Sequence, residues 1–419
     1  MKKQEVNPEH VIRQSRSKKI PVSELRIGMF VSRLDRDWLD TPFLMQGFMV
    51  ETLEHIDILV EYCKHVWVDA VEDEWVPLED RGKLKRQSRS SRYINKVDTQ
   101  LEHHRARGVY REARRITKNL LDEVRLGGAV DTENAKSTVS HCVDSILRNP
   151  DALLWMSKMR NQDEYTAEHC LNVCILTIAF GRHLGLPKQT LHQLGLCGLL
   201  HDVGKMRIST EILNKPGALT EKEFRVVKGH TIHGRNLLMS SSGLYHGVVD
   251  VAYSHHEKLD GTGYPRKLKA TSISEQARIV AIVDAYDAMT ADRCYAPAIT
   301  STDALKIIFK DRGYHFDEQL ALKFIETVGL YPPGSIVELC NGQVGLVLTV
   351  NNRYRHLPKV MTVLDEDKQP KKEKVIDLSA IESGELGRDF LIKRVLRDGS
   401  HNIRIRDFRD KGLHLSQPF

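Results

Sequence analysis

Histidine is concentrated in one part of this chain and recurs there at nearly regular steps. Nine of the 19 histidines fall within residues 169–256. Groups that can bind metals follow one another at steps of 32, 29, 25 and 28 residues, at His169, His201-Asp202, His230, His255-His256 and Asp284. Each step is about the length of one helix plus its connection, so each helix can offer a ligand group to a common centre. The spacing therefore favours a helical bundle with a metal site inside it.

The sequence around these groups has the pattern of helices. Apolar residues recur at helical spacing through residues 132–330, and the pattern is interrupted where turn-forming residues cluster: Asn149-Pro150, Gly185–Pro187, Lys215–Gly217 and Asp260–Pro265. Length also fits more than one domain, because 419 residues exceed the typical domain of about 150. We predict a helical domain over residues 132–334.

The flanking segments have different patterns. Short β-like runs at Met29–Val31 and His65–Val68 enclose a helical stretch near Glu51–Cys63. Ser335–Val350 alternates around Asn341-Gly342, the strongest short hairpin signal. The predicted fold class is mainly α, with five segments: a basic tail (1–19), a small α/β module of unknown role (20–78), a basic linker and helix (79–131), the helical domain (132–334) and a β-rich appendage (335–419).

Basic charge is concentrated before the helical domain. Residues 81–118 hold 13 Lys and Arg against 3 Asp and Glu, a local charge of +10 in a chain whose net charge is only +6. Within this stretch, residues 94–126 have helical spacing, and a solvated helix face accounts for the charge more simply than an anion-binding surface. No aromatic residues are interleaved as in a nucleic-acid interface, so we expect no nucleic-acid polymer as partner.

Cysteine usage and hydropathy indicate the compartment. The 7 cysteines include no C-x-x-C pair, and this distribution is typical of a reducing cytosol. The first 19 residues lack the apolar stretch of a secretory signal, and no apolar run approaches the roughly 18 residues of a membrane span. We therefore expect a cytoplasmic protein. Cys170 and Cys174 lie in an apolar helical pattern, which predicts core positions rather than zinc ligands.

The ligand types narrow the metal chemistry. Imidazole and carboxylate without thiolate suit iron, manganese, nickel or catalytic zinc. The number of such groups exceeds what one tetrahedral ion needs, so we predict two metals with Asp202 as the bridging carboxylate. Such a site suits phosphodiester hydrolysis, in which a metal-bridging water becomes hydroxide and the metals stabilise charge on the phosphate. Lys205, four residues after His201, is expected on the same helix face, where it would bind phosphate or assist the leaving oxygen.

Several blocks of sequence together resemble one known family, the HD-GYP subgroup of the HD-domain phosphohydrolases. They are HDVGK (201–205), ILNKPGALTEKE (212–223), HHEKLDGTGYP (255–265) and DAYDAMTADRCY (284–295), within a resemblance that spans about residues 149–332. The family hydrolyses cyclic dinucleotide messengers in bacterial signalling, chiefly cyclic di-GMP to linear pGpG and often to GMP. The resemblance implies an all-helical domain and a metal-dependent cyclic-dinucleotide phosphodiesterase.

The resemblance also implies roles for individual residues. The first metal would be held by His169, His201, Asp202 and Asp284, and Asp202 would bridge to a second metal held by His230, His255 and His256. Tyr264 and Arg293 would contact the substrate phosphate, with Lys205 beside it. Members with a third metal have a Glu one helical turn before the first His, where this chain has Tyr165. We therefore expect two divalent ions, with iron or manganese the leading candidates.

Other functions remain open at the level of sequence. The substrate could be 3′,3′-cyclic GMP-AMP, because no motif in the sequence indicates which bases the substrate pocket recognises. Hydrolysis of another nucleotide, as in other HD proteins, is disfavoured by the complete GYP signature. A non-catalytic protein that senses a cyclic dinucleotide and docks on signalling partners would be expected to have lost ligands, yet all seven are present. The helix at 94–126 also leaves a homodimer open.

Overall fold

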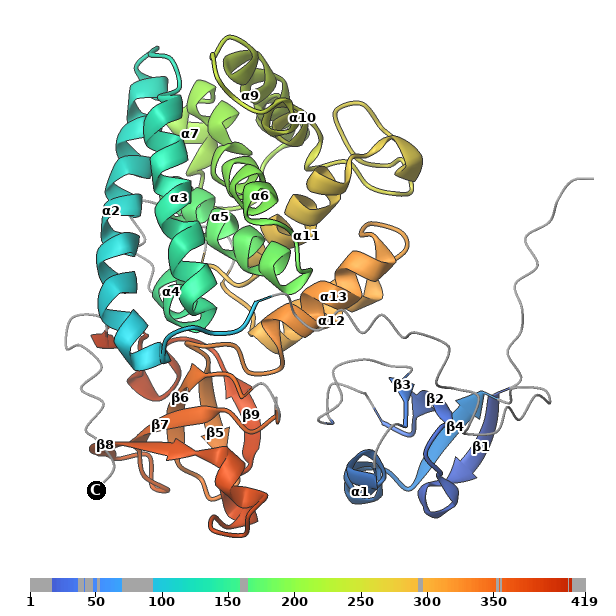
Figure 1. The fold of residues 1–419 in the computed structure, drawn as a ribbon. Coiled ribbons are helices and arrows are strands. Elements are labelled where there is room, and N and C mark those ends of the chain that lie inside the picture. Colours follow the sequence, from blue (N-terminus) through green and yellow to red (C-terminus); the bar gives the residue numbers. More distant parts are fainter. Residues whose placement is uncertain are drawn as a thin grey trace, which may run out of the picture. The chain divides into compact units, whose positions relative to one another are not determined.

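A computed structural model of the chain describes residues 17–36, 41, 48–50, 53–69, 93–158, 165–292, 297–351, 354, 356–405 and 407–408. The chain divides into two compact units, Met1–Ser88 and Arg89–Phe419. Each unit has its own layers of secondary structure (Figure 1).

In its described residues, the first unit consists of an antiparallel sheet and one α-helix, with a 3-10 turn at Val22–Glu24. Its strands are β1 (Ser17–Pro21), β2 (Phe30–Leu34), β3 (Phe48–Met49) and β4 (His65–Asp69), in the order β1-β4-β2-β3, and its helix is α1 (Leu53–Tyr62). The predicted strands near residues 29–31 and 65–68 and the helix near 51–63 are confirmed. Leu59 of α1 and Val66 of β4 are fully buried.

Strand β1 corrects the predicted extent of the basic tail. The tail was expected over residues 1–19, yet β1 begins at Ser17 and pairs with β4 in the register Ser17↔Asp69 to Pro21↔His65. Lys18 and Lys19 stay exposed while Ile20 is buried. Backbone pairing with a strand some 45 residues later in the chain holds this segment, and local composition carries no signal of it.

The second unit is built mainly of helices, which confirms the predicted fold class. They are α2 (Thr99–Arg125), α3 (Thr132–Arg148), α4 (Pro150–Ser157), α5 (Tyr165–His183), α6 (Lys188–Leu200), α7 (Thr210–Leu213), α8 (Glu221–Lys228), α9 (His230–Met239), α10 (His246–Ser254), α11 (Glu275–Met289), α12 (Ser301–Lys310) and α13 (Glu318–Val328). Helix α5 is the centre, because it is buried from Ala167 to Gly181 and contacts α2, α3, α6 and α11. Cys170 and Cys174 lie in this buried stretch, as predicted.

The helix boundaries follow from local sequence. Asn149 caps α4, whose first residue is Pro150, and its side chain accepts a hydrogen bond from the Asp151 backbone. Thr220 and Glu223 form a reciprocal capping box at the start of α8. Gly185, with φ of +72°, follows α5 in a conformation that glycine adopts without strain.

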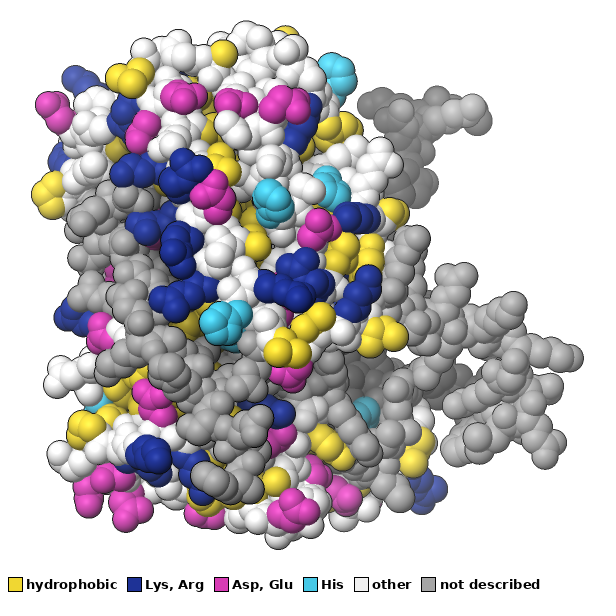
Figure 2. Space-filling view, turned by 60° about the vertical axis from the view of Figure 1, so that its left-hand side comes forward, with side chains coloured by type: hydrophobic (Ala, Val, Ile, Leu, Met, Phe, Trp, Pro, Cys, Tyr) yellow, Lys and Arg dark blue, Asp and Glu magenta, His cyan; other side chains and the backbone are white. Residues whose placement is uncertain are grey.

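The part of the basic stretch from residue 99 to residue 118 lies in helix α2, as the spacing of residues 94–126 predicted, whereas residues 81–92 lie outside the described residues. One face of α2 contacts α3, α4 and α5, and the other is exposed with Lys and Arg side chains. Figure 2 shows basic side chains gathered across the middle of the face that includes α2. Two side chains of this helix form ion pairs that contain a buried carboxylate: Arg114 pairs with the buried Glu168 at 2.8 Å, and the fully buried Glu102 pairs with Arg148 at 2.7 Å.

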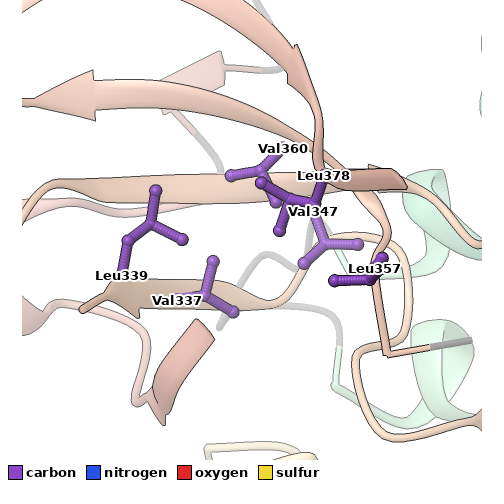
Figure 3. Packing of buried hydrophobic residues seen from close by; sticks show 6 residues of the cluster. All are labelled: Val337, Leu339, Val347, Leu357, Val360 and Leu378. Atoms are coloured by element: carbon purple, nitrogen blue, oxygen red, sulfur yellow. The ribbon is translucent and has the colours of Figure 1, made fainter. Parts of the chain in front are cut away.

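The C-terminal part of this unit is an antiparallel sheet. Its strands are β5 (Ile336–Leu339), β6 (Val344–Thr349), β7 (Lys359–Leu364), β8 (Pro370–Asp377) and β9 (Ile392–Leu396), in the order β8-β7-β6-β5-β9. Gly342, with φ of +86°, turns the predicted β5–β6 hairpin. The core of the sheet is apolar and fully buried (Figure 3): Val337, Leu339, Val347, Leu357, Val360 and Leu378.

Candidate metal centre

Five helices bring the seven predicted metal ligands together in the second unit (Figure 1). His169 lies on α5, His201 and Asp202 directly follow α6, and His230 is the first residue of α9. His255 and His256 follow α10, and Asp284 lies on α11. Helix ends supply most of the ligands, so the connections between helices, rather than the helices alone, set the distances.

Asp202 stands between two pairs of imidazoles. Its Oδ2 lies 3.4 Å from His169 Nε2 and 3.3 Å from His201 Nε2. Its Oδ1 lies 3.3 Å from His230 Nε2 and 3.7 Å from His255 Nε2. Each oxygen of this carboxylate therefore faces a different pair of imidazoles.

Asp284 and His256 complete the two sides of the centre. Asp284 Oδ1 lies 3.1 Å from His169 Nε2 and 3.8 Å from His201 Nε2. Its other oxygen, Oδ2, lies 3.9 Å from His256 Nδ1. One compact group of potential ligand atoms is Asp202, His230, His255 and His256, and another is His169, His201 and Asp202, the atoms of each lying within 4.8 Å of one another.

The donor atoms fit divalent metal ions. The buried Nε2 of His201 and Oδ1 of Asp202 have no hydrogen-bond partner in the described part of the chain. Leaving such groups unsatisfied costs about 1–3 kcal/mol each, a cost that a bound cation removes. Imidazole nitrogens and carboxylate oxygens without a thiolate suit divalent ions such as iron, manganese, nickel or catalytic zinc.

Backbone carbonyls orient three of the imidazoles. Nδ1 of His201 donates to the Gly198 carbonyl at 2.8 Å, that of His230 to Val227 at 2.6 Å, and that of His255 to Val251 at 3.0 Å. A carbonyl oxygen only accepts, so Nδ1 carries the hydrogen in each ring. In the neutral ring Nε2 then presents its lone pair to the centre, as a metal ligand must.

Asp287 orients the ring of His169 through its carboxylate. From the sequence, Asp287 was not assigned to the site. Its Oδ2 lies 2.8 Å from Nδ1 of His169, and the side chain is fully buried. The available signal was its spacing, because Asp284 and Asp287 stand three residues apart and so share one face of α11. That spacing alone is also typical of a solvated helix face.

Burial and the two carboxylates determine protonation in the centre. Burial lowers the pKa of His230 to about 3 and also lowers that of His256, so both rings are neutral at physiological pH. Burial also lowers the pKa of His201, but the charges of Asp202 and Asp284 outweigh the effect of burial and raise the pKa of His201 to about 9. Burial raises the pKa of Asp202, yet Lys205 and His201 hold it well below its ordinary value.

Lys205 faces the centre for a different reason from the one predicted. Helix α6 ends at Leu200, and Val203–Arg207 forms a 3-10 helix, so Lys205 does not share an α-helical face with His201. Residues three apart align in a 3-10 helix, which places the Lys205 ammonium against Asp202 Oδ2. The positive charge therefore lies at the carboxylate between the two imidazole pairs.

Tyr264 lies at the edge of the centre. Its ring centroid is 4.7 Å from that of His256 and 6.5 Å from that of His230. Burial raises the pKa of Tyr264, so its hydroxyl stays protonated and can donate. Glu257, a second residue that sequence reasoning missed, holds this loop by accepting from the backbone N–H of Arg266 at 2.7 Å and of Leu268 at 2.9 Å. Arg293, predicted to contact phosphate, lies outside the described residues.

Comparison with known proteins identifies the family. The HD domain family matches residues 151–320, and a domain of unknown function, DUF3391, matches residues 17–135. The chain is 37% identical to cyclic di-GMP phosphodiesterase PA4108 of Pseudomonas aeruginosa over 368 residues, which are 86% of this chain and 89% of that protein. The chain belongs to the HD-GYP family. The predicted family and enzyme class, a phosphodiesterase, are thereby confirmed.

Two further relatives match shorter stretches of the chain. Cyclic di-GMP phosphodiesterase PdeB of Borreliella burgdorferi is 28% identical over 232 residues, 55% of this chain and 60% of that protein. 3′3′-cGAMP-specific phosphodiesterase 3 of Vibrio cholerae is 35% identical over 168 residues, 40% of this chain and 36% of that protein. In the described residues, no helix has the length and apolar character needed to cross a membrane.

Proposed function

We propose that this protein hydrolyses a cyclic dinucleotide, cyclic di-GMP in the first place, with two divalent metal ions. The observation that carries the proposal is the placement of Asp202, whose two oxygens face two different pairs of imidazoles at 3.3–3.7 Å. A carboxylate in that position joins two metal sites into one centre. Two-metal centres are well suited to phosphodiester hydrolysis, because both the attacking and the leaving oxygen are stabilised.

The other six ligands would divide into two sets of three around this carboxylate. His169, His201 and Asp284 would hold one ion together with Asp202, and His230, His255 and His256 would hold the other. When bound, iron or manganese would supply an activated water and stabilise negative charge on the phosphate. The protein's own contribution is the fixed tautomer of four of the five imidazoles and the burial that excludes bulk water.

Two side chains beside the ligands suit an anionic substrate. Lys205 brings an ammonium group to the edge of the centre, where it would bind a phosphate oxygen or support the departing one. Tyr264 would donate its hydroxyl to the substrate phosphate from the neighbouring loop. Glu257 keeps that loop in place through two backbone hydrogen bonds.

Cyclic GMP-AMP is the second candidate substrate. The similarity to the Vibrio cholerae enzyme specific for 3′3′-cGAMP favours it, but that similarity covers 40% of this chain, whereas the Pseudomonas relative named for cyclic di-GMP covers 86%. We therefore place cyclic di-GMP first.

The proposal is tested by purifying the protein without oxygen and loading it separately with Fe(II) and Mn(II). Both cyclic dinucleotides are then followed by chromatography, with metal content measured on the same samples. We expect turnover, and we expect Asp202→Ala to lose both turnover and metal because the shared ligand is gone. Full metal occupancy without turnover of either substrate would contradict the proposal and favour a protein that senses the nucleotide without cleaving it.

Arg293 gives a separate prediction of the same proposal. Arg293→Ala should raise KM for the dinucleotide while metal content stays at the wild-type level, because a side chain that contacts phosphate is not a metal ligand. Metal analysis beside steady-state kinetics checks this. Loss of metal in the variant would show that Arg293 has a different role.

A further inference from the structure

Phe224 and Lys228 extend a line of side chains outward from the metal centre. The Phe224 and Tyr264 ring centroids are 6.4 Å apart, and the Lys228 ammonium lies 4.8 Å from the first and 5.7 Å from the second. Tyr264 in turn lies 4.7 Å from the ring of His256. The order from the centre outward is thus a metal-ligand candidate, a tyrosine, a lysine and a phenylalanine.

Phe224 does not serve the protein core. Its side chain is 46% exposed, and helix α8, which carries it, has no buried residue. An exposed aromatic ring held beside a second ring by a cation has the arrangement of a stacking surface. Flat rings of this kind bind nucleobases through their faces, whatever the base.

Lys228 is also available to a ligand. In the described part of the chain, no carboxylate pairs with its ammonium group, whose recorded contacts are the two rings. The nearby Glu223 is taken by Lys215 at 2.7 Å and by the Thr220 cap. The positive charge between the rings therefore remains uncompensated, and a phosphate anion could neutralise it.

We propose that Phe224 and Lys228 form a nucleobase subsite, in which a purine of the substrate stacks on Phe224 and Lys228 faces the adjoining phosphate. The inference rests on the proposed function, because it assumes that a cyclic dinucleotide occupies the metal centre. In a nucleotide the base is separated from its phosphate by one sugar, and Phe224 is separated from the centre by one ring, that of Tyr264. The subsite would hold one base while the scissile phosphate lies at the metals.

The first test measures KM and kcat of Phe224→Ala with cyclic di-GMP. Removal of a stacking side chain should raise KM by about 5-fold to 150-fold. We expect kcat and metal content to change little, because the metal ligands are untouched, and Phe224→Trp should restore a KM near the wild-type value. Ile307→Ala is the matched control, because Ile307 is an apolar side chain of similar exposure, 41%, on α12.

A second test reports stacking directly. A cyclic dinucleotide that contains 2-aminopurine loses fluorescence when this base stacks on an aromatic ring. We expect quenching on binding to the metal-loaded wild type and to Phe224→Trp, and little quenching with Phe224→Ala at saturating protein. Lys228→Met should bind more weakly and with a smaller dependence on salt, because one charge contact to phosphate is removed.

The outcomes separate this inference from the proposed function. If the wild type neither binds nor hydrolyses any cyclic dinucleotide, the proposed function itself fails. If the wild type hydrolyses the substrate but Phe224→Ala keeps its KM and its quenching, the subsite alone is wrong. That second result would leave Phe224 as an exposed side chain without a role in substrate binding.

Discussion

At the scale of single residues, four of the five imidazoles of the centre are oriented by an acceptor at Nδ1. Backbone carbonyls serve His201, His230 and His255, and the backbone cannot be removed by mutation. His169 depends instead on the carboxylate of Asp287, at 2.8 Å from Nδ1. A carboxylate behind an imidazole fixes its tautomer and raises its basicity, and so strengthens the bond to a metal.

Asp287→Ala should therefore weaken metal binding without removing a ligand. We expect about 10-fold to 100-fold lower affinity for the metal that His169 contacts, with a smaller loss in Asp287→Asn, whose amide oxygen still accepts. Competition with a chelator, followed by metal analysis, measures the effect. Asp122→Asn, an exposed position on α2, is the control. Equal affinity in Asp287→Ala and wild type would show that His169 is oriented by other contacts.

At the scale of elements, the 3-10 helix that follows Asp202 packs directly on α9. Gly204 lies in this 3-10 helix, and a Cβ built on it would collide with the carbonyl oxygen of His230 and the backbone nitrogen of Gly234. Both neighbours are backbone atoms, so no side chain can rotate away. This close approach sets the distance between Asp202, which precedes the 3-10 helix, and His230, the first residue of α9.

Gly204→Ala should separate the two elements and damage the centre. We expect a loss of about 3 kcal/mol in the free energy of unfolding, at the upper end for overpacking, together with reduced metal content. Gly108→Ala on α2 is the matched control, because a Cβ there meets nothing within 4 Å and should stabilise the helix by up to about 1 kcal/mol. Urea unfolding and metal analysis check both. Normal metal content in Gly204→Ala would contradict the argument.

At the scale of the whole second unit, a buried carboxylate joins the helices to the C-terminal sheet. Asp151 on α4 accepts a hydrogen bond from the backbone N–H of Val350, just after β6, at 3.2 Å. Burial raises the pKa of Asp151 from 3.8 to about 6, against smaller opposing effects of Val350 and Arg182. The native protein therefore binds a proton here more tightly than the unfolded chain does.

This raised pKa makes stability fall as pH rises. The stabilisation from Asp151 is fully present below the pKa that this residue has in the unfolded chain, and it is lost as pH rises through the pKa in the folded protein. From pH 5 to 7.5 the free energy of unfolding of the wild type should therefore fall by about 1.4 kcal/mol more than that of Asp151→Asn. Urea unfolding followed by tryptophan fluorescence is the measurement, with the buried Trp155 nearby on α4 as a probe. Titration of the metal ligands affects both proteins and cancels in the difference. Identical pH profiles would show that Asp151 has an ordinary pKa.

Much of the fold could be predicted from local pattern. Helical spacing placed α2 and the bundle, turn residues marked where helices end, and Asn341-Gly342 marked the β5–β6 hairpin. Each of these signals is contained in a few neighbouring residues. Strand β1 was not predicted because its partner, β4, lies far along the chain. Pairing over that distance produces no recognisable pattern in the local sequence of a basic segment.

The sequence by itself determined the chemical types at the centre: which residues can bind a metal, in what order they occur, and which family they belong to. Only the tertiary structure decided which atoms meet. It placed one oxygen of Asp202 toward each pair of imidazoles, turned Lys205 onto Asp202 through a 3-10 helix, and set Asp287 behind His169. The physical reason is that a side chain's identity is local, whereas its orientation depends on packing between helices that lie far apart in sequence.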